Sequence, residues 1–308
     1  MPSIRLGAFP PLQGPTPAPE TVTTFARAAA LAGLDHVCTA DHVSFFVGAG
    51  TDGLLSATAL AMTDATIPIY VAVYLLPLRH PTLVARQVAD LELLAPGRLV
   101  LGLGIGGEDP HEYTVCGVDP RTRGRRMDEC LQVLRLLLAG TPVTFHGEFF
   151  DLDDALILPA PPSPVPLIVG GRSDAAVRRA ARLGDGWIGV WNSARRYAEV
   201  VASIDEQAAA AGRADHPRAH AMQVWCGIAD DRGEARTLVS TAMEGFYQIP
   251  FDRFERYSPF GTPADIAEFL VPYVEAGCTT FNLIPQSPDV DTAVAGAAEV
   301  KRLLSASA

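Results

Sequence analysis

The chain has 308 residues, of which 48% are hydrophobic and 19% are charged, and its formal net charge is −11. This composition is typical of a soluble globular protein with a large core, and an acidic chain without basic runs is a poor binder of nucleic acid or anionic membranes. The five cysteines are odd in number and form no C-x-x-C motif, which excludes a disulfide framework and favours a reducing compartment.

Short apolar runs alternate with helical stretches along the chain. The first residues, MPSIRLGAFPPLQGP, lack a secretion-signal pattern, and the longest apolar run, 67–78, is too short to cross a bilayer, so we expect a cytoplasmic protein. Expected strands occupy 4–9, 36–42, 69–76, 98–104, 167–171, 186–191, 221–229 and 278–284. Helices are expected over 20–34, 54–64, 82–94, 126–140, 173–184, 194–212, 261–277 and at the C-terminus.

Two segments interrupt the alternation. Segment 141–166 reads as two short extended pieces and a proline-rich link, which we interpret as an insertion after the fourth helix, and a longer helical excursion near the seventh runs to Phe260. About eight strand–helix units require a parallel sheet covered by helices and have the size of a (β/α)₈ TIM barrel. We therefore predict one α/β barrel domain over 1–308, with a doubly wound open sheet as the alternative, since both give the same local signals.

Gly102, Gly104 and Gly107 spell G-x-G-x-x-G in the fourth expected strand. A dinucleotide fingerprint requires these glycines in the first strand–turn–helix, and the proline- and glycine-rich segment after Gly107 predicts no helix there. In a barrel, Gly106 and Gly107 instead fall at the carboxyl end of a strand, where glycine lets a flat ligand approach the backbone. The alternative is that small residues merely fit the taper of the barrel.

A second glycine pair suggests an anion site. Gly170 and Gly171 end a strand, and Ser173 or Asp174 caps the helix that begins immediately. Free N–H groups and the helix dipole favour an anion at such a position, and Arg172 could add a charge-assisted contact. Asp174 counts against this hypothesis because its charge already lies at the positive helix end. The alternative is an ordinary loop with a good cap.

Asp41 and His42 follow the second expected strand, where both side chains can reach the mouth of a barrel. Histidine is the usual proton shuttle near neutral pH, although a capping aspartate and a packed histidine would explain the same pair. Four further polar residues follow the fourth strand and could line the same mouth: Glu108, Asp109, His111 and Glu112.

Other kinds of catalytic centre have little support. The seven histidines are dispersed and form no H-x-H motif, so we expect no catalytic metal. There is no G-x-S-x-G motif, and the sequence contains one lysine, Lys301, near its end, so a covalent nucleophile is not expected. An enzyme without a nucleophile or metal often relies on an organic cofactor.

Several stretches taken together resemble the bacterial luciferase-like family. They are PGRLVLGLGIGG, RGRRMDECLQVLRLLLAG, ARLGDGW and GTPADIAEFLVPYVEAGCTTF, and the resemblance runs from residue 4 to about residue 304. It implies a TIM barrel that binds FMN or the deazaflavin coenzyme F-420 across the carboxyl end of the barrel. Family habit also implies a homodimer and a flavin or deazaflavin reductase that supplies reduced cofactor.

The resemblance implies a role for each candidate residue. His42, with Asp41, would exchange a proton near the reacting edge of the ring, and Glu108 is the candidate for a further catalytic carboxylate. A non-proline cis peptide is expected behind the ring, around Val73 and Tyr74. The remaining cofactor contacts would come from the glycines of the fourth strand and from the phosphate loop: Gly104, Gly106, Gly107, Gly170, Gly171, Arg172 and Ser173.

The resemblance leaves several functions open. We favour an F-420-dependent oxidoreductase that transfers a hydride to or from a small substrate. An FMN-dependent monooxygenase, a non-catalytic flavin-binding protein and a metal-dependent barrel hydrolase are the alternatives. The scarcity of lysine disfavours a sugar phosphate, and apolar loop residues favour a hydrophobic substrate: Phe45, Phe46, Phe246, Tyr247, Phe251 and Phe254.

Overall fold

The computed structural model describes residues 4–11, 19–48, 50–63 and 67–307. Eight parallel strands pair side by side, and the pairing of β11 with β1 closes them into a barrel. In barrel order they are β1 Arg5–Ala8, β2 His36–Thr39, β3 Ile69–Leu75, β4 Leu99–Gly104, β7 Leu167–Gly170, β8 Gly186–Val190, β9 Ala221–Ile228 and β11 Thr280–Gln286. The predicted TIM barrel is confirmed.

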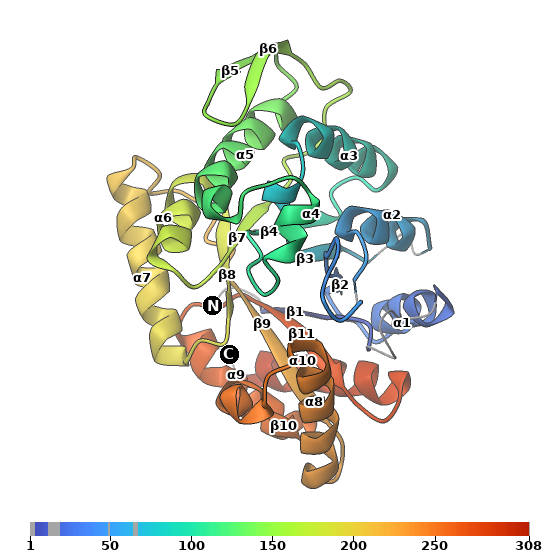
Figure 1. Cartoon of the computed structure of the whole chain (residues 1–308). Helices are drawn as coiled ribbons and strands as arrows, with labels where there is room; N and C mark the ends of the chain where they lie inside the picture. The colour runs from blue at the N-terminus through green and yellow to red at the C-terminus, as the bar shows by residue number, and fades with distance from the viewer. Residues whose placement is uncertain (1–3, 12–18, 49, 64–66, 308) are drawn as a thin grey trace.

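Helices surround the barrel and bury its outer face (Figure 1). They are α1 Pro19–Leu31, α2 Gly53–Thr63, α3 Pro81–Leu94, α5 Arg123–Leu138, α6 Asp174–Leu183, α7 Ala194–Ala210, α9 Pro263–Glu275 and α10 Val290–Ser307. The main core lies between strands and helices and includes Leu6, Leu101 and Phe281, each with no exposed surface. Among the described residues no helix is long and apolar enough to cross a membrane. The last residue of the expected 54–64 helix lies outside the described residues.

Two segments extend beyond the barrel. An antiparallel hairpin, β5 Val143–His146 and β6 Asp151–Ala155, lies between α5 and β7 and projects at the top of Figure 1. The Glu129 carboxylate of α5 accepts three backbone N–H groups of the hairpin turn, from residues 148–150, and thereby fixes the hairpin to the helix.

The second segment follows β9 and is less regular than expected. Helix α8, Arg232–Tyr247, ends at Gln248, whose φ of 53° is left-handed. Two single 3₁₀ turns, η3 Phe251–Arg253 and η4 Glu255–Tyr257, and the short strand β10, Phe260–Gly261, then lead into α9. The expectation of one helical stretch to Phe260 is therefore wrong in its second half, because Pro250 cannot continue an α-helix from Gln248.

The expectation that no helix forms soon after Gly107 is also wrong. A short helix, α4 His111–Val115, and a 3₁₀ turn, η2 Pro120–Thr122, precede α5. Pro110 and Pro120 stand at the start of these turns, where a missing N–H costs nothing because that group has no partner inside the helix. The prolines therefore begin helical turns here.

Close backbone packing at the start of β8 leads to a stability prediction. A Cβ atom on Gly186 would lie 2.0 Å from the carbonyl oxygen of Ala219, so Gly186→Ala should lower the free energy of unfolding by about 3 kcal/mol. Gly245 of α8 has nothing within 4 Å of such an atom, and Gly245→Ala should raise the same quantity by about 0.5–1 kcal/mol. Urea unfolding measures both, and an unchanged midpoint for Gly186→Ala would contradict the packing.

Candidate functional site

Asp41, just beyond β2, is the buried centre of the connections at the carboxyl end of the barrel. One carboxylate oxygen accepts the N–H of Gly53 at 2.9 Å and Arg79 Nη2 at 2.8 Å, and the other accepts the N–H of Leu75 at 2.8 Å and Arg79 Nη1 at 2.6 Å. These contacts join the end of β2 to the start of α2 and the end of β3. Asp41 is 2% exposed and its oxygens are occupied, so it positions the backbone that carries His42.

Arg79 extends this connection on its other side. Its guanidinium also lies 2.9 Å from Asp52 Oδ2, and its Cζ lies 4.3 Å from the centroid of the Tyr74 ring. Tyr74 has no exposed surface and belongs to the main core. Of the side chains predicted to meet a cofactor, Asp41 and Tyr74 are therefore enclosed by protein, and the structure does not bring them to the open mouth.

His42 is held by a carboxylate from a different loop. Its Nδ1 lies 3.1 Å from Glu112 Oε2, and the two side chains are 13% and 3% exposed. A neutral His42 that donates from Nδ1 to the carboxylate leaves Nε2 as the nitrogen that can take up a proton. Glu112 was one of four acidic or histidine residues expected near the mouth, and it is the one that contacts His42.

Glu112 also fixes the backbone of the loop after β2. Its Oε1 accepts the N–H groups of Val43 at 2.7 Å and Ser44 at 3.2 Å. Burial opposes ionisation of this carboxyl, but the hydrogen bonds from His42, Val43 and Ser44 outweigh burial, and the pKa of Glu112 is lowered from its ordinary value. Glu112 is therefore a carboxylate at neutral pH.

The other polar residues after β4 point elsewhere. Glu108 and His111 are exposed, and Asp109 is buried, with Oδ1 accepting the N–H of His111 at 2.9 Å. Asp109 and His111 thus form the start of α4, which turns Glu112 toward His42. Glu108 stays a predicted catalytic residue without a contact to His42 that would support the role.

Aromatic side chains form a wall beside His42. The Phe45 ring stacks on the imidazole with centroids 4.1 Å apart and an interplanar angle of 26°. Phe46 lies 4.4 Å and Phe246 of α8 lies 5.0 Å from Phe45 between ring centroids, and Phe246 also lies 5.8 Å from His42. The end of α8 is thus brought against the loop after β2.

The wall continues from Phe246 into a larger aromatic group. Adjacent ring centroids lie 4.8–5.9 Å apart through Trp225, Tyr247, Trp191 and Phe254. Trp225 Nε1 donates to the Tyr247 hydroxyl at 3.1 Å, whereas the buried Trp191 Nε1 has no hydrogen-bond partner among the described residues. Phe251 and Phe254, which were expected from the sequence to meet the substrate, belong to a buried hydrophobic cluster with Trp225, and the partly buried Phe246 and Tyr247 pack against that cluster.

The glycines of β4 and those of the loop after it are glycine for different physical reasons. A Cβ on Gly102 would lie 2.5 Å from the carbonyl oxygen of Val71, and one on Gly104 would lie 2.5 Å from Val73 Cγ2, so both make room for β3. Gly106 and Gly107, beyond the strand, have φ values of 61° and 139°, which other residues rarely adopt. The peptide bond between Ala72 and Val73 is cis, at the place where the resemblance predicts one.

The expected phosphate loop lies between β7 and α6. Gly171 has a φ of 127°, and Ser173 caps α6 by accepting the N–H of Ala176 at 3.3 Å. Arg172 is exposed, and its Cζ lies 5.2 Å from the centroid of the Trp191 ring, which links this loop to the aromatic group. The structure thus places an open helix N-terminus on the same side of the barrel as His42.

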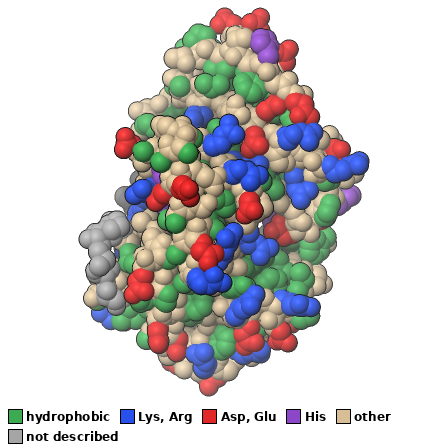
Figure 2. Space-filling model, turned by 90° about the vertical axis from the view of Figure 1, so that its left-hand side faces the viewer, with side chains coloured by type: hydrophobic (Ala, Val, Ile, Leu, Met, Phe, Trp, Pro, Cys, Tyr) green, Lys and Arg blue, Asp and Glu red, His purple; other side chains and the backbone are tan. Residues whose placement is uncertain are grey.

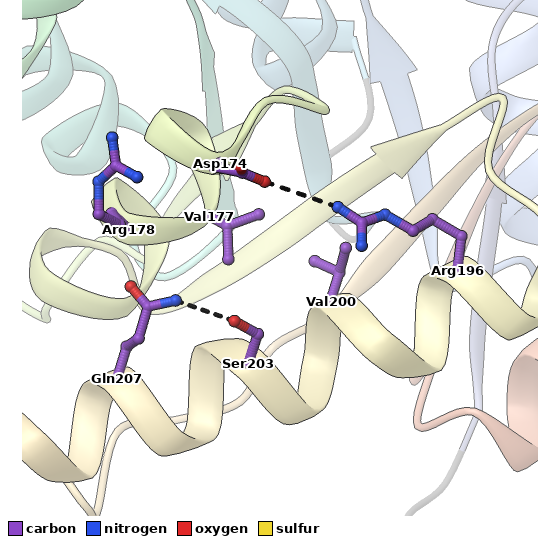
Figure 3. Close-up of a pocket in the computed structure, with 7 residues that line it drawn as sticks. All are labelled: Asp174, Val177, Arg178, Arg196, Val200, Ser203 and Gln207. Carbon is purple, nitrogen blue, oxygen red and sulfur yellow. Dashed lines mark hydrogen bonds and ion pairs between the residues drawn. The ribbon is translucent and has the colours of Figure 1, made fainter.

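A hollow of about 380 Å³ begins beside this helix terminus (Figure 3). It lies between α6 and α7, where Asp174 faces Arg196 at 3.7 Å and Gln207 donates to Ser203 at 2.9 Å. Figure 2 shows this side of the molecule, with basic and acidic side chains interspersed. The hollow borders the proposed phosphate loop from outside the barrel and does not contain His42.

A second histidine, His36, lies inside the barrel but does not take up a proton near neutral pH. His36 Nε2 lies 2.6 Å from Asn282 Oδ1, and His36 is 4% exposed. Burial lowers the pKa of His36 to about 4, so the ring stays neutral at physiological pH. His42 is the better placed of the two for proton exchange with a ligand at the mouth.

Comparison with known proteins begins with a family model. The model of the luciferase-like monooxygenase family matches residues 4–260. An F420-dependent hydroxymycolic acid dehydrogenase of Mycobacterium tuberculosis is 29% identical over 259 residues, which cover 72% of this chain and 68% of that protein. An F420-dependent glucose-6-phosphate dehydrogenase of Beutenbergia cavernae is 31% identical over 233 residues, covering 73% and 68%.

Other matches show a short stretch of higher identity and the shared fold. An uncharacterized protein of Mycobacterium tuberculosis is 46% identical over 114 residues, so the match spans only 38% of that relative and 37% of this chain. An F420-dependent secondary alcohol dehydrogenase in complex with an F420-acetone adduct superposes with a TM-score of 0.86 at 22% identity over 98% of this chain and 99% of the other. A type II Baeyer-Villiger monooxygenase from Pseudomonas putida in complex with FMN superposes with 0.76 at 19% identity, covering 99% of each.

The contacts of Glu112 predict a pH-dependent contribution to stability. Glu112→Gln should lower the free energy of unfolding at pH 7 by about 2 kcal/mol, because one amide oxygen replaces a charged acceptor of three donors. Since folding lowers this pKa below 4.5, the difference between wild type and variant is complete above pH 4.5 and disappears as pH falls through the folded pKa.

Urea unfolding from pH 3 to pH 7 measures that difference. Glu108→Gln is the matched control, since Glu108 is exposed and four residues away. A difference that stays constant across the range would show that the charge of Glu112 is not responsible.

Proposed function

The chain belongs to the luciferase-like monooxygenase family, and we propose that it is an oxidoreductase that uses coenzyme F-420 to move a hydride to or from a small apolar substrate. The observation that carries the proposal is the geometry of His42, whose Nδ1 is held by Glu112 while Nε2 remains for proton exchange beside an aromatic wall. Relatives named as F420-dependent dehydrogenases, aligned over about 70% of this chain, support the choice of cofactor.

The described residues fit a phosphate-bearing cofactor. The first turn of α6 offers N–H groups without partners inside the helix, Gly171 gives the backbone its left-handed φ, and Arg172 is exposed beside Trp191. The negative charge of Asp174 at this helix end is partly offset, because its Oδ1 lies 3.7 Å from Arg196 Nη2 (Figure 3). Gly106 and Gly107 would allow a flat ring to approach the backbone at the end of β4.

The protein's own residues would handle the proton and the water. Coenzyme F-420 supplies a two-electron hydride acceptor or donor when it is bound. His42 Nε2 takes the hydroxyl proton when an alcohol is oxidised to a carbonyl and returns it in the reverse direction. Glu112 fixes the imidazole and stabilises its protonated form, while Phe45, Phe46 and Phe246 cover the reacting centre and exclude water.

The FMN-dependent monooxygenase is the second candidate function. A monooxygenase with FMN shares the fold over 99% of this chain, and the phosphate loop would suit either cofactor. A reductase that supplies reduced cofactor and a homodimer both stay predictions. The aromatic wall favours an apolar substrate over a sugar phosphate in either case, because the described mouth offers Phe45, Phe46 and Phe246 where a phosphate would need cations.

Cofactor choice is tested by titrating the purified protein in parallel with coenzyme F-420 and with FMN, followed by fluorescence. We expect tight binding of F-420, and Arg172→Ala should weaken it about tenfold through loss of one charge-assisted contact to the phosphate. Arg178→Ala is the matched control, because this exposed arginine lines the neighbouring hollow. Tight binding of FMN alone would move the proposal to oxygen chemistry, and binding of neither would remove it.

The role of His42 is tested with His42→Ala and small secondary alcohols as probe substrates. Loss of a positioned proton acceptor should lower kcat/KM by about 10²–10⁴-fold while the dissociation constant of F-420 stays within about twofold. His111→Ala, an exposed histidine after the fourth strand, should change neither quantity. Stopped-flow loss of F-420 fluorescence gives the rates, and wild-type turnover by His42→Ala would exclude His42 as the proton acceptor.

A further inference from the structure

We propose that Asp205, His216 and His220 bind one divalent metal ion, best suited to Zn²⁺, at the amino-terminal end of the barrel. The site is separate from the mouth that holds His42, because His220 immediately precedes the first residue of β9, whereas the proposed catalytic groups follow the last residues of their strands. The ion would join α7 to the segment that leads into β9.

The three side chains converge from two elements. Asp205 lies on α7, and His216 and His220 lie in the connection between α7 and β9, with the H-x₃-H spacing seen in many zinc sites. One ligand atom from each residue lies within 4.8 Å of the others. His216 and His220 are 7% and 1% exposed, so two imidazoles are enclosed around one point.

Among the described residues, buried nitrogens of this cluster lack hydrogen-bond partners: both ring nitrogens of His220 and Nε2 of His216. Asp205 Oδ1 also accepts no hydrogen bond there, although Arg218 lies at ion-pair distance from it. A buried polar group without a partner is strongly disfavoured, and these converging nitrogens call for a bound group that satisfies them. A metal ion satisfies lone pairs from all three residues at once.

The orientation of His216 matches that of a metal ligand. Its Nδ1 lies 3.2 Å from the carbonyl oxygen of Arg213, and donation to that oxygen turns the lone pair of Nε2 toward the cluster. There Nε2 lies 3.4 Å from Asp205 Oδ1, so in the neutral ring two acceptors face each other, and a cation between them would stabilise both. Ligands about 2.0–2.1 Å from a tetrahedral zinc ion are about 3.3–3.4 Å apart, so this pair already has the required separation.

Arg218 would compete, through its guanidinium, with a metal ion for the carboxylate of Asp205. Its Nε lies 3.0 Å from Asp205 Oδ1, and its side chain is 58% exposed, so it can turn into solvent when a metal binds. The backbone φ of Arg218 is 51°, in the left-handed region, which asparagine tolerates well, so asparagine is a suitable replacement at this position. Two imidazoles and one carboxylate, with water as the fourth ligand, form a donor set that suits Zn²⁺.

The test is zinc binding by tag-free protein after treatment with a chelator. We expect one equivalent of Zn²⁺ to remain after dialysis, measured by mass spectrometry of the metal, and Tm to rise by about 5 °C at zinc a hundredfold above Kd. Co²⁺ in place of Zn²⁺ should give the visible absorption of a tetrahedral site. No retained zinc and no change in Tm in the wild type would overturn the proposal.

Variants locate the ion. Asp205→Asn and His220→Gln should weaken binding at least tenfold, whereas His146→Gln, at an exposed His146–Asp151 pair on the hairpin, should leave it unchanged. Arg218→Asn should tighten binding several-fold by removing the competing cation, and this outcome does not depend on the buried variants folding. Equal zinc affinity in Asp205→Asn, or weaker affinity in Arg218→Asn, would count against the site.

Discussion

The ion pair between Asp41 and Arg79 is the interaction on which the carboxyl end of the barrel depends. Two parallel strands that end side by side leave their following loops free to diverge, and here one buried carboxylate joins both ends to the start of α2. Removing Arg79 would leave the buried Asp41 carboxylate with only the N–H groups of Gly53 and Leu75 to stabilise its charge, which is far more destabilising than the pair is stabilising. His42 is the next residue after Asp41, so the place of its imidazole follows from this pair, and Glu112 then sets its orientation.

The proposed catalytic groups and the proposed metal site lie at opposite ends of the barrel. Loops at the carboxyl ends of the strands can vary without disturbing the hydrogen bonds of the sheet, and His42, the aromatic wall and the proposed phosphate loop all lie there. The cluster around His216 and His220 lies at the opposite end, where α7 turns back into β9. A metal at that end would act on the stability of the barrel and leave proton exchange at His42 untouched. The two proposals can therefore fail independently.

Much of the fold could be predicted from periodicity, because buried parallel strands are continuous apolar runs and the covering helices are amphipathic. The prediction that no helix follows Gly107 was wrong because it treated proline only as a helix breaker. Pro110 instead begins the helical turn that carries Glu112. His42 could be placed because it follows a strand, but its partner is 70 residues away and depends on the direction of a five-residue helix. The dispersed histidines argued against a catalytic metal, and they did not reveal that the connection between α7 and β9 brings His216 and His220 to Asp205.

The glycine motif of β4 shows how one sequence pattern can arise from several unrelated demands. Gly102 and Gly104 are small because Val71 and Val73 of the neighbouring strand occupy the space that their side chains would fill. Gly107 has nothing within 4 Å of an added Cβ atom, so crowding cannot explain it, and its φ of 139° can. Strand packing thus accounts for the first two glycines and backbone conformation for the third. Their spacing matches a dinucleotide fingerprint although the sheet is closed and the helix that follows begins only at His111.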